Sequence, residues 1–137
     1  MAPMLVVMIG QALQLVRRSL RADCLILSCW MRSNPAMAEP LVSVITPAYN
    51  AVRFLPRVVE CVRRQLGVSY EHIIVDDCST DDGWLELQKL AADDERIIII
   101  RLPNNRGVVE ARNAAISQAR GRYLAFLDAD DLWLEDK

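Results

Sequence analysis

Histidine and paired cysteines are scarce in this 137-residue chain. His72 is the only histidine, and the four cysteines contain no C-x-x-C pair. Structural zinc sites and disulfide frameworks depend on such patterns, so we expect neither to hold this protein together. Single, scattered cysteines are instead typical of proteins from a reducing compartment.

Basic charge is not in excess either. Lys and Arg number 16 against 18 Asp and Glu, which gives a net charge of −2. Proteins that bind nucleic acid usually present a basic face to the phosphate backbone, so we expect no nucleic-acid partner. The 5 glycines and 6 prolines are too few for a low-complexity chain, and 53% hydrophobic with 25% charged residues is typical of a globular domain.

The apolar runs near the N-terminus are short. Residues 1–16 carry no charge but are interrupted by Gly10 and Gln11, and a second run covers only 24–31. A helix that spans a bilayer needs about 20 apolar residues. A secretory signal with a cleavage site near Ala38 and an amphipathic helix on a membrane surface are two interpretations of this region.

A third interpretation concerns the start of the chain. Met37 directly precedes the first clean strand pattern, so it is a candidate initiator, with residues 1–36 as an over-extended reading frame. We therefore expect an N-terminal extension at 1–39 and one domain at 40–137.

The region 40–137 alternates β-branched runs with segments of helical periodicity. We expect strands at 41–46, 72–75, 97–100 and 123–127, and helices at 53–66, 82–92 and 108–119, the second helix with N-cap chemistry from residues 79–82. Apolar strands separated by helices predict an α/β fold with the order β-α-β-α-β-α-β and a mostly parallel sheet covered on both faces. Ligands bind such sheets at the carboxyl ends of the strands.

Polar residues follow three of the four expected strands. These stretches are Thr46 to Asn50, Asp76 to Ser79, and Asp128 to Asp131. Because parallel strands end at one edge of the sheet, their carboxylates and the ring of Tyr49 should gather there. Carboxylates that lie close together repel one another unless a cation neutralises them, and hard oxygen ligands suit Mg²⁺ or Mn²⁺.

The spacing of Asp128 and Asp130 supports this chemistry. Residues i and i+2 at a strand end point to the same side, so one carboxylate can hold a metal and the other a ribose hydroxyl. Tyr49, which comes soon after a strand-ending proline, offers a flat face to a nucleobase. The structural alternative for the two aspartates is turn and helix-capping chemistry.

Four ordered motifs resemble the nucleotide-binding half of family-2 glycosyltransferases, which have the Rossmann-like GT-A fold. The resemblance extends over residues 41–133. The matching stretches are Val42 to Asn50, Ile74 to Asp81, Asn105 to Gly107 with Ala111 to Asn113, and Gly121 to Trp133.

The resemblance implies a base-binding pocket on the first two strand ends. Thr46, Pro47 and Tyr49 would line it, with Tyr49 against a uracil-type ring. Asp77 would hydrogen-bond the base or the ribose. Capping of the next helix is the structural alternative for Asp77 and for its neighbour Asp76.

The resemblance also implies a diphosphate site. Arg112 would approach the nucleotide from the third helix, with a surface ion pair as its structural alternative. Asp128 would contact the ribose or the metal, and Asp130 would be the main ligand of a divalent metal, Mg²⁺ or Mn²⁺. Members of this type invert the anomeric carbon and use a carboxylate base.

Two departures from the family pattern stand out. The family commonly has glycine where this chain has Cys78, so that loop is expected to differ slightly. The chain also ends at Lys137, soon after the D-x-D motif, and the catalytic base is expected beyond that residue. We therefore expect a partial GT-A domain that provides the donor-binding half.

Three other functions are open at this point. A D-x-D phosphohydrolase of the haloacid-dehalogenase type would use Asp128 as nucleophile, although its motif normally follows the first strand. A receiver-type domain would need a suitably placed lysine, but Lys89 lies in an expected helix and Lys137 is the last residue. A non-catalytic nucleotide-binding or interaction fragment is the main alternative.

The resemblance implies partners and a location as well. The donor would be a nucleotide-diphosphate sugar, of the UDP-sugar type, and the acceptor a glycan or a lipid-linked sugar. Enzymes of this kind make cell-envelope polysaccharides. We expect the protein in the cytoplasm or associated with the inner face of the cytoplasmic membrane.

Overall fold

The computed structural model describes residues 39–65 and 67–134 of the chain. The three interpretations of the N-terminal region, including the candidate start at Met37, lie outside these residues. In the part that is described, no helix is long and apolar enough to cross a membrane.

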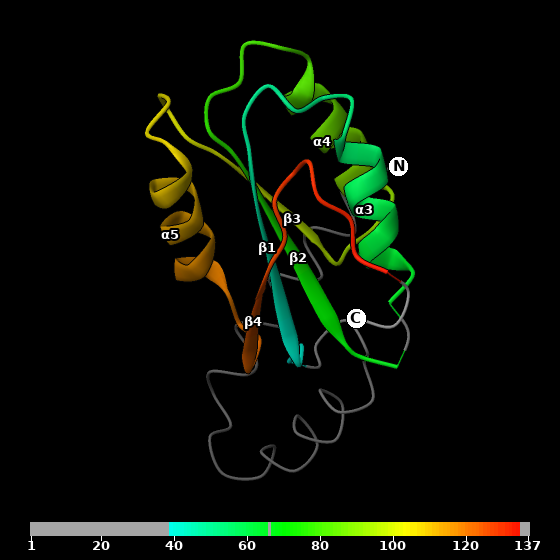
Figure 1. Cartoon of the computed structure of the whole chain (residues 1–137). Coiled ribbons are helices and arrows are strands. Elements are labelled where there is room, and N and C mark those ends of the chain that lie inside the picture. Colours follow the sequence, from blue (N-terminus) through cyan, green and yellow to red (C-terminus); the bar gives the residue numbers. More distant parts are fainter. Residues whose placement is uncertain (1–38, 66, 135–137) are drawn as a thin grey trace, which may run out of the picture. The chain divides into compact units, whose positions relative to one another are not determined.

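Four parallel strands and three helices alternate along the domain (Figure 1). The elements are β1 (Val42–Ala48), α3 (Leu55–Arg63), β2 (Tyr70–Asp76), α4 (Gly83–Ala92), β3 (Ile97–Arg101), α5 (Val108–Gln118) and β4 (Tyr123–Phe126). The spatial order of the strands is β3-β2-β1-β4. The predicted α/β class, the element order and the parallel sheet are confirmed.

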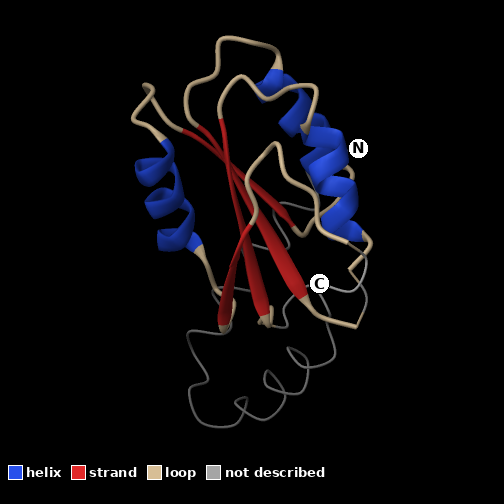
Figure 2. Ribbon diagram, in the orientation of Figure 1, coloured by secondary structure: helices blue, strands red, loops and turns tan. Residues whose placement is uncertain are grey.

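Helices cover both faces of the sheet (Figure 2). On one face α3 and α4 pack on apolar residues of the strands, among them Val44 and Ile74, and α4 contributes the buried Leu87 to this core. On the other face α5 packs on Ile45 and Ile73. This arrangement follows from the two central strands, β1 and β2, whose side chains are buried on both faces of the sheet.

The first strand is longer than the sequence pattern predicts. Pro47 was expected to end it, yet β1 continues to Ala48, with Pro47 opposite Val75 of β2. Ile45 accepts a hydrogen bond from the backbone N–H of Leu127 on the β4 side, and Pro47, two residues later, faces the same side. Because β4 has ended by then, the missing N–H of Pro47 costs no ladder bond.

The helix boundaries are close to those predicted, with one change of capping residue. Pro56 lies in the first turn of α3, where its missing N–H is tolerated. The N-cap position of α4 is Asp82, but its side chain makes no capping bond. Asp81 does so instead, because its Oδ1 accepts the N–H of Gly83 at 2.9 Å.

Cys78, where the family commonly has glycine, takes up a backbone conformation that favours glycine. Its φ is +58°, in the left-handed region. A side chain is unfavourable there by about 1–2 kcal/mol. The loop therefore keeps a glycine-like backbone shape at Cys78 and carries strain.

Candidate functional site

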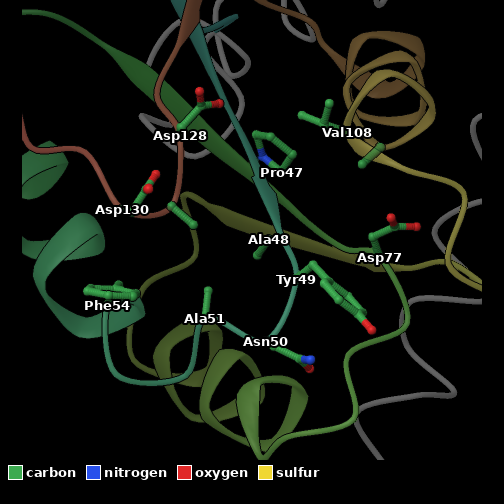
Figure 3. Close-up of a pocket in the computed structure, with 12 residues that line it drawn as sticks. Pro47, Ala48, Tyr49, Asn50, Ala51, Phe54, Asp77, Val108, Asp128 and Asp130 are labelled. Carbon is green, nitrogen blue, oxygen red and sulfur yellow. The ribbon is translucent and has the colours of Figure 1, made fainter.

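A cavity of ≈ 310 Å³ lies at the carboxyl ends of β1 and β2, between the start of α5 and the residues after β4. Its walls come from these four segments (Figure 3). The lining residues are Pro47, Ala48, Tyr49, Asn50, Ala51, Phe54, Asp77, Val108, Ala111, Asp128, Ala129 and Asp130. Of the predicted site residues, Pro47, Tyr49, Asp77, Asp128 and Asp130 are thus brought together.

The D-x-D segment has the alternation that the spacing predicts. Ala129 is 8% exposed and packs in the core beneath the cavity, whereas Asp128 and Asp130 are the less buried residues of the three that line it. In Figure 3 these two aspartates lie on one side of the cavity, and Tyr49 and Asp77 lie on the other. The backbone N–H of Asp131 donates to the carbonyl of Asp128 at 3.0 Å, so a turn fixes the segment.

Arg112 is held at the edge of the cavity by Asp128. Its Nη2 donates to Asp128 Oδ1 at 2.6 Å, and its guanidinium lies 5.8 Å from the ring centre of Phe126. The Nε of Arg112 is buried and has no hydrogen-bond partner among the described residues. The ion pair named as the structural alternative for Arg112 is therefore present. It places the Arg112 guanidinium beside Asp128, the first aspartate of the D-x-D motif.

Asp77 lines the cavity and also has a structural task. It is 3% exposed, and its two carboxylate oxygens accept the backbone N–H groups of Arg106 at 2.8 Å and Gly107 at 2.7 Å. These bonds fix the loop that leads into α5. Sequence reasoning considered helix capping for Asp77 but did not foresee this loop, which lies 29–30 residues away.

Asp76 stays out of the cavity. It is 1% exposed, its Oδ1 accepts the N–H of Ser79 at 3.1 Å, and its Oδ2 lies 3.2 Å from Arg101 Nε. The second contact is an ion pair without a hydrogen bond. Asp76 therefore does not cap the next helix, as its structural alternative supposed; it fixes the turn after β2 instead.

Thr46 was expected to line the base pocket, and this expectation is wrong in the structure. Its side chain is fully buried, and its Oγ1 lies 2.9 Å from Nε2 of His72. The cause is the extra length of β1, which places Thr46 inside the strand rather than at its end. Burial lowers the pKa of His72 to about 3, so this ring is neutral in the folded protein.

Two loops of the site are joined by residues that the motif analysis did not single out. Asn50, with φ of +50°, accepts hydrogen bonds from the backbone N–H and the hydroxyl of Thr80 at 2.9 and 3.1 Å. Its own N–H donates to Ser79 Oγ at 2.9 Å, and Asp81 Oδ2 accepts the N–H of Val52 at 3.1 Å. An asparagine just after a strand is the only sequence signal for this role.

Asp128 and Asp130 are the residues from which metal chemistry was predicted. Within residues 39–65 and 67–134, no group of three or more His, Cys, Asp or Glu side chains is arranged to hold a metal ion. A complete protein cage is therefore absent from this part of the chain. The pair fits another mode, in which Mg²⁺ is held by one or two carboxylates together with substrate phosphates and water.

This fold and this site define a class of protein. The chain belongs to glycosyl transferase family 2, whose family profile matches residues 43–137. It is similar to TuaG of Bacillus subtilis, a glycosyltransferase provisionally assigned to teichuronic acid biosynthesis, with 50% identity over 72% of this chain and 39% of that protein. It is also similar to WfaP of Escherichia coli, a UDP-Glc:alpha-D-GlcNAc-diphosphoundecaprenol beta-1,3-glucosyltransferase, with 44% identity over 71% of this chain and 38% of that protein.

Solved structures confirm the predicted GT-A fold. TarS 1-349 of S. aureus in complex with UDP has a TM-score of 0.64 and 30% identity over 69% of this chain and 29% of that chain. The mannosyltransferase PcManGT of Pyrobaculum calidifontis, in complex with GDP-Man and Mn²⁺, has a TM-score of 0.65 and 26% identity over 72% of this chain and 30% of that chain. The chain thus spans less than two fifths of the length of the two curated relatives named above.

Proposed function

We propose that this chain is the donor-binding part of a metal-dependent, inverting glycosyltransferase that takes a sugar from a nucleotide-sugar donor of the UDP-sugar type. The observation that carries the proposal is the cavity, because the ring of Tyr49, three carboxylates and an arginine meet around it from four separate segments. Such a set suits a base, a ribose and a diphosphate with its cation.

Each residue then has a role. The ring of Tyr49, 49% exposed, is available to stack on the base. Asp77 accepts a hydrogen bond from base or ribose, and Asp128 binds the ribose or the cation, while Asp130 is the main ligand of Mg²⁺ or Mn²⁺. Held there, the cation would supply positive charge to the diphosphate of the departing nucleotide. Arg112 adds positive charge at the same place.

The solved neighbours support the class of donor. TarS was solved with UDP and with UDP-GlcNAc, and PcManGT with GDP-Man and Mn²⁺. The acceptor we propose is a glycan or a lipid-linked sugar, at the cytoplasmic face of the membrane. The name of WfaP, which includes a diphosphoundecaprenol-linked sugar, supports this choice.

A calorimetric titration of the 137-residue chain with UDP and Mn²⁺ tests the proposal. We expect binding that is lost when EDTA removes the metal and is weakened at least about tenfold by Asp130→Asn, since charge-assisted contacts are the strong ones. Asp131→Asn is the matched control, because Asp131 is exposed and does not line the cavity. Equal binding by the wild type and Asp130→Asn with Mn²⁺ present would refute the assignment.

Nucleotide binding without sugar transfer is the second candidate. Among the described carboxylates at the cavity, Asp77 is engaged by two backbone N–H groups and Asp128 by Arg112, and Asp130 is assigned to the metal. None of them is then left to act as the base for an acceptor hydroxyl. Release of UDP from UDP-sugar by this chain, with an acceptor glycan present, would favour transfer, and binding without release would favour the second candidate.

A further inference from the structure

Glu71 is a buried carboxylate at the opposite end of β2 from the cavity. It is 2% exposed, and it accepts hydrogen bonds from Ser43 Oγ at 2.6 Å, from the backbone N–H of Arg120 at 2.6 Å and from Arg120 Nε at 2.9 Å. Burial raises the pKa of Glu71, but these hydrogen bonds outweigh it and hold the pKa below its ordinary value. The carboxylate is therefore ionised and tied to the residues just after α5.

Asp77, directly after β2, makes the corresponding contacts at the other end of α5. Its two oxygens accept the N–H groups of Arg106 and Gly107, which immediately precede Val108, the first residue of the helix. Two buried carboxylates from the two ends of one strand thus hold the two ends of one helix. Figure 1 shows α5 alone on its side of the sheet.

The apolar contacts of α5 do little to fix its position along its axis. Its buried residues are Ala111 and Ala115, which lie on Ile45, Ile73 and Val75. An alanine methyl group is too small to interlock with neighbouring side chains as larger residues do. The hydrogen bonds at the two ends of α5, together with the bond from Arg112 to Asp128, therefore carry most of the resistance to a shift along the helix axis.

Such a shift would reach the cavity, because α5 contributes Val108 and Ala111 to its wall and Arg112 to Asp128. A shift of one residue along the axis displaces a side chain by about 1.5 Å. That is enough to break the 2.6 Å bond between Arg112 and Asp128.

We propose that Glu71 is a positioning residue for nucleotide binding, which it controls from the far end of the sheet by anchoring the C-terminal end of α5 through Arg120. The proposal rests on the proposed function for its effect on UDP affinity, but the anchoring itself is independent of any ligand. Of the two carboxylates that hold α5, Glu71 is the one to mutate. Asp77 lines the cavity, so a substitution of Asp77 would alter the contacts to the ligand directly.

The test compares Glu71→Gln and Arg120→Met with Asp94→Asn in the 137-residue chain. Arg120→Met removes a side chain that is 64% exposed, so this variant should fold even if Glu71→Gln does not. Asp94 is the matched control: its side chain is 8% exposed, and it accepts hydrogen bonds from Arg63 and Arg96, which lie away from α5. Two quantities are measured, the hydrogen exchange of α5 amides without nucleotide and the Kd for UDP with Mn²⁺.

We expect Glu71→Gln and Arg120→Met to speed exchange in the last turn of α5 and at the amide of Arg120. We expect UDP to bind them about tenfold more weakly, since displacements near 1 Å have effects of this size or larger. Asp94→Asn should leave both quantities unchanged. Unchanged hydrogen exchange in both test variants would overturn the anchoring of α5 by Glu71. Faster exchange with wild-type affinity for UDP would overturn the link between this anchoring and the cavity. An equal loss of UDP affinity in Asp94→Asn would overturn that link as well. A wild-type chain that binds no UDP refutes the proposed function, while the exchange data still decide whether Glu71 anchors α5.

Discussion

Gly121→Ala should be one of the most damaging small substitutions in the domain. The backbone of Gly121 lies against β1, where its N–H donates to Ser43 Oγ at 2.8 Å. A Cβ added at this residue would collide with the backbone nitrogen of Ser43 and lie 2.6 Å from its Oγ and 2.7 Å from the carbonyl carbon of Val42. Backbone atoms cannot rotate away, so β4 would have to move off β1.

The structure gives a rough size for this effect. Overpacking against a rigid surface costs up to about 3 kcal/mol, and loss of a buried hydrogen bond costs about 1 kcal/mol more. A loss of about 3–4 kcal/mol would lower the melting temperature by more than about 10 °C in a domain of this size. The short β4, which pairs with β1 over only Tyr123–Phe126, has little else to hold it.

Urea unfolding of the wild type, Gly121→Ala and Gly67→Ala measures the difference. Gly67 has φ of +80° and open space around its Cα, so alanine there costs only the left-handed strain, about 1–2 kcal/mol. We expect Gly121→Ala to shift the urea midpoint clearly further than Gly67→Ala, with a similar dependence on urea concentration. If Gly121→Ala were no more destabilising than Gly67→Ala, the close approach to β1 would be refuted.

Three further predictions concern single residues. Cys78→Gly should stabilise the fold by about 0.5–1 kcal/mol in urea unfolding, since it removes the left-handed strain at a small entropic cost, and a loss of stability would contradict this. The folded-state pKa of His72 lies near 3 and its ordinary value near 6.5, so between these two pH values only the unfolded chain gains a proton. The free energy of unfolding should therefore decrease as the pH is lowered through that range, by up to about 1.4 kcal/mol per pH unit. Its proton resonance, the only one from a histidine, should not titrate near pH 6.5 in the folded chain, and titration there would show that the ring is not buried. Asn50→Ala should cost about 2 kcal/mol, because it removes both hydrogen bonds from Thr80, and a thermal melt equal to that of the wild type would exclude this bridge.

Much of the fold could be predicted because the chain carries strong local signals. Each strand is a short β-branched or apolar run, α3 has an apolar face, and α4 follows a capping sequence. These local patterns do not depend on partners far along the chain. Element order together with the rule for parallel sheets then places Tyr49, Asp128 and Asp130 at one edge, which the structure confirms.

The boundaries of individual elements were less predictable, and one site residue was misplaced as a result. Pro47 is a local signal for a strand end, but β1 passes through it because the neighbouring strand has already ended on that side. Thr46 is therefore buried beside His72 instead of facing the cavity. This outcome depends on the length of β4, which no pattern around Pro47 contains.

The sequence by itself determined the class of fold, the family and the edge of the sheet where the polar residues gather, because these depend on periodicity and on residue types next to one another. The tertiary structure alone decided how the carboxylates are used. Asp77 binds two loop amides, Glu71 holds the end of α5, and Asp128 pairs with Arg112, across separations of 16–49 residues. Hydrogen bonds of this kind depend on distances and angles between segments that meet only after folding, so the chain order cannot reveal them.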